Sequence, residues 1–286
     1  MPHTSPIQLV AVDIDGTLMT DAKDISPFTA REVRRVGTEG LASVVLMSSR
    51  MPTAIDPLRE ALVAAAYYSA YSGALTCRVV GDEHERLFER VLDRDLVGTA
   101  ISVASELALN IGVFIDRQWW TSTLDQWALR EVRDTGVWPE PDDLQELAKD
   151  GRFDRVHKLD LRGEAGKIAT AVRAIREGFA KRVDINDADE NMAELTPADA
   201  GKLNSLKVIC EHAGIPLDNV LAIGDGGVDV EMIRAAGWGV AVGNATPEAQ
   251  EAADEVTLSN NDDGVGLILR KHFPTNEQTS KFSDTF

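Results

Sequence analysis

Short apolar runs recur near both ends of the chain, and glycine or polar residues follow each of them. The first run, residues 9–12, is rich in β-branched valine, as is typical of a strand buried on both faces of a parallel sheet. Predicted helices at 27–39 and 53–65 separate it from the next runs. Similar runs lie at 41–47, 66–74 and 220–223. This alternation of strands and helices predicts an α/β core with a parallel sheet.

The pattern changes at about residue 79, where short strands and amphipathic helices follow one another without long buried runs. Helices are predicted at 95–109, 124–134, 142–149 and 164–178, and strands at 111–115, 119–123, 153–161, 183–185 and 192–195. This order predicts an α+β unit with an antiparallel sheet that interrupts the core. The core is therefore expected at 1–78 and 197–273, the inserted unit at 79–196 and a frayed tail at 274–286.

Two features of the inserted unit leave their roles open. Residues 153–161 alternate like a strand with one wet face, which predicts that His157 and Lys158 lie on a solvated face. Tryptophans at irregular spacing usually pack in a core or an interface, although an indole facing a cleft can bind the face of a sugar or ring. Four of the five tryptophans lie in this unit: Trp119, Trp120, Trp127 and Trp138.

Composition excludes some classes of partner. The 286 residues are 44% hydrophobic, which is ordinary for a globular chain with a substantial core. The net charge of -18 opposes binding to nucleic acid or to an anionic membrane surface. Cys77 and Cys210 show neither metal-ligand spacing nor a disulfide framework, and no signal peptide or apolar run of about 18 residues is present, so we expect a cytoplasmic protein. A monomer and a dimer are equally compatible with the sequence.

Asp13 and Asp15 follow the first predicted strand, and Gly16 offers a sharp turn directly after them. Ligands of open α/β sheets bind at the carboxyl ends of the strands. Two carboxylates separated by one residue repel each other, so a cation that neutralises them would explain the arrangement. The alternative is an ordinary polar turn with solvated aspartates.

Three other segments carry candidate chemistry. Ser48 follows the second strand, where its hydroxyl either caps a helix or holds a phosphate. Lys202 lies in the first turn of a predicted helix, where the helix dipole disfavours a cation, so it either binds an anion or is simply solvated. Asp225 and Asp229 follow a buried strand and a glycine, which repeats the pattern around Asp13.

These segments resemble, in order, the four motifs of the haloacid dehalogenase superfamily of phosphohydrolases. Residues 13–18, Asp-Ile-Asp-Gly-Thr-Leu, are similar to the first motif, and Ser48, Lys202 and residues 224–232 are similar to the other three. The subfamily that the chain resembles most is the Cof type. Three residues depart from the usual pattern of that subfamily: Ser49 replaces a glycine, Ser72 replaces an asparagine and Val228 replaces an asparagine.

The resemblance implies a Rossmann-like catalytic core with an inserted cap that acts as a lid and selects the substrate. Asp13 would attack phosphorus and become an aspartyl-phosphate, and Asp15 would act as general acid and base. Asp13, the Asp15 main-chain carbonyl and Asp225 would bind Mg²⁺. Asp229 and Gly226 would lie just outside the direct ligands of the ion.

Ser48, Ser49 and Lys202 would hold the phosphoryl oxygens in this scheme. The implied activity is magnesium-dependent hydrolysis of a small phosphorylated metabolite, foremost a sugar phosphate. A phosphomutase with the same intermediate and a non-catalytic metal-binding or ligand-binding relative are the alternatives. Val228 would place an apolar side chain beside the metal and phosphate region, or would point into the core beneath its loop.

Overall fold

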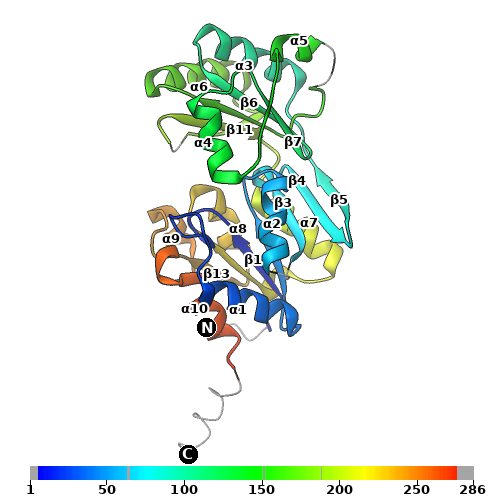
Figure 1. The fold of residues 1–286 in the computed structure, drawn as a ribbon. Helices are drawn as coiled ribbons and strands as arrows, with labels where there is room; N and C mark the ends of the chain where they lie inside the picture. The colour runs from blue at the N-terminus through cyan, green and yellow to red at the C-terminus, as the bar shows by residue number, and fades with distance from the viewer. Residues whose placement is uncertain (1–5, 63–64, 150, 152, 188, 276–286) are drawn as a thin grey trace, which may run out of the picture.

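Two β-sheets organise the chain in a computed structural model, which describes residues 6–62, 65–149, 151, 153–187 and 189–275. One sheet forms the centre of the core and the other forms the centre of the cap, and the two units lie one above the other in Figure 1. The chain runs through the first core strands, crosses into the cap and returns to complete the core. The predicted α/β class and the inserted α+β segment are thereby confirmed.

The core sheet has eight strands among the described residues, and six of them run parallel to one another. The last two form an antiparallel hairpin at one edge. Their order across the sheet is β14 (Glu255–Val256), β13 (Trp238–Ala241), β12 (Val220–Gly224), β1 (Leu9–Asp13), β2 (Ser43–Met47), β3 (Ala65–Ala70), β4 (Leu75–Val80) and β5 (Glu83–Glu89).

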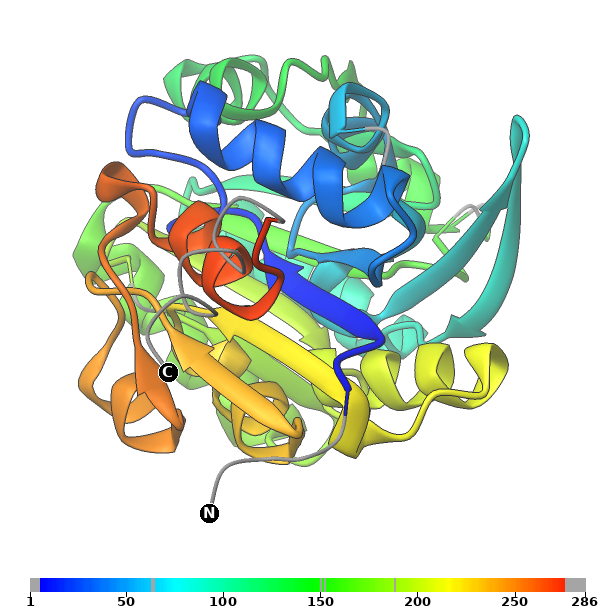
Figure 2. The same ribbon diagram turned by 90° about the horizontal axis from the view of Figure 1, so that it is seen from below.

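Helices cover both faces of the core sheet, as the view in Figure 2 shows. One face packs against α1 (Pro27–Thr38), α2 (Pro52–Leu62) and α10 (Gly264–His272), and the other against α7 (Lys202–Ala213) and α8 (Val230–Ala235). The short helix α9 (Pro247–Ala252) packs beside α8 and β13. The central strand β1 is buried along its whole length, which explains its continuous apolar sequence.

The cap sheet has six strands in the described part of the chain, and all of its pairings are antiparallel except the one between β7 and β8. Their order is β10 (Val183–Asn186), β11 (Met192–Pro197), β9 (Lys158–Arg162), β6 (Asn110–Ile115), β7 (Gln118–Thr121) and β8 (Glu140–Pro141). The outer face packs against α3 (Arg94–Glu106), α5 (Leu144–Lys149) and α6 (Ala165–Phe179). On the inner face, α4 (Gln126–Thr135) lies between the cap sheet and the core (Figure 1).

Short 3₁₀ turns connect several of these elements, at Tyr71–Gly73, Leu217–Asn219, Gly227–Asp229 and Asn260–Asp262. The core sheet continues through β4 and β5 to Glu89, so residues 79–89 belong to it rather than to the cap sheet. The predicted division of the chain into two domains stays a prediction. Residues 276–286, most of the predicted tail, lie outside the described residues.

The prediction of a wet face for residues 153–161 is wrong. β9 lies between β11 and β6 and is buried on both faces, with His157 and Lys158 only 0% and 2% exposed. Tyr71 of the core stacks on the His157 ring with centroids 5.3 Å apart. An alternating sequence showed that the two faces of the strand differ in polarity, but α4 lies over the polar face as well, where its Glu131 pairs with Arg162.

Two of the cap tryptophans pack, as tryptophans at irregular spacing commonly do. Trp119 is buried and stacks on Phe114 with ring centroids 5.2 Å apart, and Trp120 is buried against Phe153. Trp127 is half-buried and Trp138 is exposed. No helix in the described ranges is long and apolar enough to cross a lipid bilayer.

Candidate active site

The carboxyl ends of β1, β2 and β12 meet at one edge of the core sheet. Asp13 is the last residue of β1, Ser48 directly follows β2, and Asp225 directly follows β12. β1 pairs in parallel with both of the other strands, so this edge brings together residues that are far apart in the sequence. Lys202 begins α7 on the same side of the sheet, where its ammonium reaches Asp13.

Three carboxylates form the centre of this site. Asp13, Asp225 and Asp229 each offer one oxygen, and these oxygens lie within 4.8 Å of one another. Lys202 donates hydrogen bonds to Asp13 and to Asp229, the latter at 2.7 Å. Asp13, Asp229 and Lys202 are all at least 95% buried. One buried ammonium therefore faces three converging carboxylates, which leaves negative charge for a further cation to offset.

The pKa values of two of these carboxyls reflect that imbalance. Burial raises the pKa of Asp13 well above its usual value, and the charges of Asp229 and Asp225 raise it further, against the opposing effect of Lys202. Burial also raises the pKa of Asp225, against a hydrogen bond from Thr17. A bound divalent cation would favour the ionised forms of both groups.

Asp229 also holds the loop that carries Asp225. Its Oδ2 accepts hydrogen bonds from the Asp225 and Gly226 main-chain nitrogens at 3.2 and 3.0 Å. A Cβ at Gly224 would lie 2.5 Å from the Cβ of Asp229, so this close approach requires glycine. The structure thus places Asp229 within the carboxylate cluster and in contact with the Gly226 main chain.

Gly16 allows the first loop to approach Asp225. Its φ is +80°, and a Cβ there would lie 2.5 Å from Asp225 Oδ2. Thr17 Oγ1 donates to Asp225 Oδ1 at 2.7 Å, and Asn244 Nδ2 donates to the Gly16 carbonyl at 2.8 Å. Sequence reasoning gave Thr17 and Asn244 no role, although Thr17 belongs to the same short motif as Asp13.

The Asp15 carboxylate lies outside the cluster and is paired with two cations. Arg50 donates to both of its oxygens and Lys23 donates to Oδ1 at 2.8 Å. Burial alone would raise the pKa of Asp15, but Arg50 and Lys23 together lower it to about 2. Sequence reasoning assigned neither cation a role; the signal for Arg50 was its place two residues after Ser48.

Ser48 and Ser49 form the loop that follows β2. Ser48 is buried, and its Oγ accepts a hydrogen bond from the Arg50 main-chain nitrogen at 3.0 Å. The Ser48 carbonyl accepts a hydrogen bond from the Ser72 nitrogen at 2.9 Å, while Ser49 is half-buried. The Ser48 hydroxyl keeps its own proton available to donate to an anion bound at this edge.

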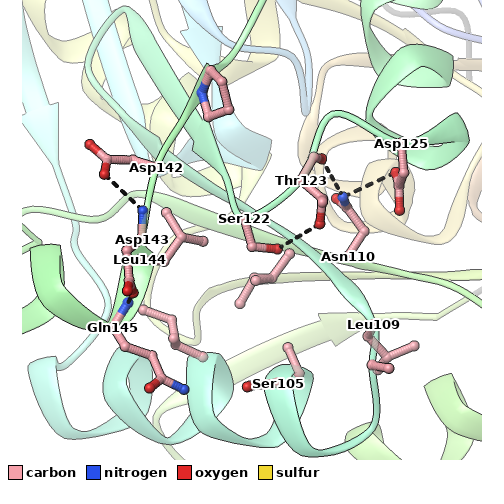
Figure 3. Close-up of a pocket in the computed structure, with 15 residues that line it drawn as sticks. Ser105, Leu109, Asn110, Ser122, Thr123, Asp125, Asp142, Asp143, Leu144 and Gln145 are labelled. Atoms are coloured by element: carbon pink, nitrogen blue, oxygen red, sulfur yellow. Dashed lines mark hydrogen bonds between the residues drawn. The ribbon is translucent and has the colours of Figure 1, made fainter.

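Val228 does not pack into the core beneath its loop. Its side chain is half-buried and lines a crevice of about 610 Å³ that Lys202 also lines. A larger hollow of about 790 Å³ is lined by cap residues and by none of the three clustered carboxylates, and Figure 3 shows this lining. In that hollow the buried Asn110 amide is already engaged by the Thr123 carbonyl and Asp125, at 2.9 and 3.1 Å.

Comparison with known proteins decides the family of this chain. The sequence model of the haloacid dehalogenase-like hydrolases matches residues 10–269. The chain belongs to this family. This haloacid dehalogenase-like hydrolase is 28% identical over 266 residues to the 5-amino-6-(5-phospho-D-ribitylamino)uracil phosphatase YcsE of Bacillus subtilis. The aligned residues cover 92% of this chain and 95% of that protein.

Solved structures show the same fold. A haloacid dehalogenase-like hydrolase from Bacteroides thetaiotaomicron superposes with a TM-score of 0.83 at 28% identity, covering 93% of this chain and 100% of that one. A sugar phosphatase of subclass IIB superposes with a TM-score of 0.77 at 21% identity over 93% and 98% of the two chains. The resemblance to the Cof-type haloacid dehalogenase hydrolases is confirmed, and hydrolases of this superfamily generally use a divalent metal ion.

Proposed function

We propose that this hydrolase is a magnesium-dependent phosphatase that cleaves a phosphomonoester of a small metabolite, foremost a sugar phosphate, through an aspartyl-phosphate on Asp13. One observation carries the proposal. The Lys202 ammonium bridges Asp13 and Asp229 inside the buried carboxylate cluster that Asp225 completes. Such a site combines a carboxylate nucleophile with positive charge to hold a phosphoryl group.

The donor set suits Mg²⁺. Asp13, Asp225 and Asp229 offer only hard oxygen ligands, and Mg²⁺ is commonly bound by one or two carboxylates together with waters and substrate phosphate. Asp13, Asp225 and the Asp15 main-chain carbonyl would hold the ion, with Asp229 and Gly226 supporting the loop around it. The ion would neutralise charge on the phosphoryl oxygens and on the nucleophile.

The side chains of the protein carry out the bond-forming and proton-transfer steps of the proposed reaction. A carboxylate oxygen of Asp13 forms a bond to phosphorus while the bond from phosphorus to the substrate oxygen breaks, and Asp15 gives its proton to that oxygen. Asp15 then takes a proton from water, whose oxygen attacks phosphorus and releases inorganic phosphate and free Asp13. Ser48, Ser49 and Lys202 would hold the phosphoryl oxygens throughout.

The substrate class is supported by the relatives and by the cap. The similar Bacillus subtilis protein is named as a phosphatase of a ribityl phosphate, and a structural neighbour is a sugar phosphatase. In this chain the inner face of the cap sheet lies toward the core, so the cap would exclude water and contact the leaving group.

A panel of phosphorylated metabolites, with p-nitrophenyl phosphate as a generic substrate, tests the proposal. Steady release of inorganic phosphate should require added Mg²⁺ and should fall at least about 1000-fold in Asp13→Asn. Asp82→Asn, at the turn between β4 and β5, is the matched control and should keep full activity. Full activity after chelation or in Asp13→Asn would refute the mechanism, and phosphate transfer to a second hydroxyl without net release would indicate a mutase.

A further inference from the structure

The 3₁₀ turn Tyr71–Gly73 is bonded through its main chain to the loop that follows β2. The Tyr71 nitrogen donates a hydrogen bond to the Arg50 carbonyl at 3.1 Å. The Ser72 nitrogen donates to the Ser48 carbonyl at 2.9 Å. The turn therefore fixes the loop that presents the Ser48 hydroxyl.

The same turn also contacts the segment that leads into α7. The Ser72 carbonyl accepts a hydrogen bond from the Gly201 nitrogen at 3.1 Å. A Cβ at Gly73 would clash with the Gly201 carbonyl, so the main chains of the two segments lie in close contact. Lys202 directly follows Gly201. One turn thus joins the loop of Ser48 to the segment of Lys202, and these two residues are proposed to hold the phosphoryl group.

Two residues of the turn have a left-handed main chain. The φ of Tyr71 is +54° and that of Ser72 is +53°, and neither residue is glycine. Residues with a side chain seldom adopt this conformation, and the strain persists only where the surrounding structure enforces it. The conformation of the turn therefore depends on contacts that its side chains make elsewhere.

The Tyr71 side chain makes such contacts with the cap. It is fully buried, and its ring stacks on the ring of His157, with centroids 5.3 Å apart and planes at 16°. Its hydroxyl donates to the Asp116 carbonyl, between β6 and β7, at 2.9 Å. The His157 ring is itself held, because Nδ1 accepts from the Asp116 nitrogen at 3.2 Å and Nε2 donates to Glu89 at 2.8 Å. Tyr71 thus contacts the cap with its side chain and the catalytic loops with the main chain of its turn.

We propose that Tyr71 is a positioning residue that couples the cap to the loops that hold the phosphoryl group. The proposal rests on the proposed phosphatase function. Contact of the Tyr71 side chain with the cap keeps the strained turn in place, and the turn keeps Ser48 and Lys202 in the arrangement that binds phosphate. Because coupling between two sites is reciprocal, phosphate held by the loops stabilises the contact between Tyr71 and Asp116 in return.

Binding of inorganic phosphate in the presence of Mg²⁺ tests this coupling. Tyr71→Phe keeps the ring but loses the hydrogen bond to the Asp116 carbonyl, so the Kd of phosphate should rise about fivefold. Tyr68→Phe is the matched control, because Tyr68 is also buried and its hydroxyl lies 2.9 Å from Nδ1 of His84, in the core sheet. Tyr68→Phe should lower the melting temperature as Tyr71→Phe does, without a change in the Kd of phosphate.

Ser72→Asn distinguishes the coupling from a simple loss of stability. Asparagine adopts the left-handed conformation more readily than serine, so less strain is left for the cap contact to hold. Added to Tyr71→Phe, the substitution should tighten phosphate binding about threefold more than it does in the wild type. An equal gain in both backgrounds would overturn the proposal, because the amide would then act on phosphate independently of Tyr71.

Hydrogen exchange measures the reciprocal effect in the cap. Saturating phosphate should slow exchange of the Asp116 amide at least about threefold in the wild type, and not in Tyr71→Phe. An unchanged phosphate Kd in Tyr71→Phe, an equal rise in Tyr68→Phe, or equal slowing of exchange in the wild type and Tyr71→Phe would overturn the coupling. A wild-type protein that neither binds phosphate nor hydrolyses p-nitrophenyl phosphate would instead refute the phosphatase function itself.

Discussion

Arg50 holds both carboxylate oxygens of Asp15, with Nε 2.6 Å from Oδ2 and Nη2 2.7 Å from Oδ1. This bidentate pair, together with Lys23, outweighs the effect of burial and lowers the pKa of Asp15 to about 2. Asp15 is therefore ionised at neutral pH in this arrangement, whereas a general acid must carry a proton. In the proposed mechanism, an entering phosphoryl group would compete for the same guanidinium, and release of Arg50 would allow Asp15 to take up that proton.

Removal of Arg50 should shift the pH dependence of kcat/KM for a sugar phosphate. A kcat/KM that requires protonated Asp15 falls as the pH rises through the pKa of that carboxyl in the free enzyme. Arg50 lowers this pKa, so Arg50→Gln should move the alkaline limb to higher pH, by about 1 unit. Lys23→Gln, whose side chain is 43% exposed, should move the limb less. A shift to lower pH in Arg50→Gln would contradict the assigned role of Asp15.

Glycine at position 16 should be essential for activity. The Cβ of Gly16→Ala would lie 2.5 Å from Asp225 Oδ2, so the carboxylate must move. A displacement of this size near the reacting groups should lower kcat/KM about 100-fold. Gly40→Ala is the matched control, because Gly40 also has a positive φ, +67°, but nothing lies within 4 Å of its Cβ position.

Gly40→Ala should keep its activity and lose about 1 kcal/mol of unfolding free energy from backbone strain alone. Steady-state kinetics and urea denaturation of both variants separate the two effects. A Gly16→Ala variant with normal kinetics would show that the loop has room which the structure does not indicate.

The buried Lys158 should make a large contribution to the stability of the cap. Its ammonium lies 2.9 Å from Glu194 and 3.2 Å from Asp160, and their charges raise the pKa of Lys158 above its usual value despite burial. Lys158→Met leaves the buried Glu194 without its cation, while Arg162 still pairs with Asp160 at 3.3 Å, and should lower the unfolding free energy by about 3–5 kcal/mol. Lys167→Met removes a cation whose side chain is 39% exposed and lies 4.0 Å from Glu164, and it should lower the unfolding free energy by less than about 0.5 kcal/mol. Urea denaturation measures the unfolding free energy of both variants, and equal losses in the two would argue against a structural role for the buried Lys158.

Val228→Asn should strengthen magnesium binding without a loss of thermal stability. An amide at position 228 would restore hydrogen bonding beside the proposed metal site, where such supporting contacts are worth about 10-fold in affinity. The side chain lines the crevice and is half-buried, so an amide there keeps access to water. Magnesium half-saturation and melting temperature measure the two effects, with Val80→Asn, at a 51% exposed position, as the control. An unchanged magnesium concentration at half-saturation together with a lowered melting temperature in Val228→Asn would contradict this prediction.

The sequence indicated the core strands and the edge at which their polar residues meet. Apolar runs at 9–12, 41–47 and 220–223 are local signals, and parallel strands share their carboxyl ends whatever lies between them. Asp13, Ser48 and Asp225 could therefore be assigned to one edge before any distance was known. Ser26 caps α1 in the structure, where its hydroxyl accepts a hydrogen bond from the Thr29 nitrogen at 3.1 Å.

Only the tertiary structure decided the partners of the charged side chains. Alternation around Lys158 could not reveal that Glu131 of α4 pairs with Arg162 of β9 or that Tyr71 stacks on His157, because these partners come from segments distant in the sequence. The pairing of Arg50 with Asp15 likewise depends on the packing of β1 against β2. The sequence by itself determined which residues form strands and which follow them, since those preferences are local. Burial and charge pairing depend on the surroundings of each side chain, and folding alone brings those surroundings together.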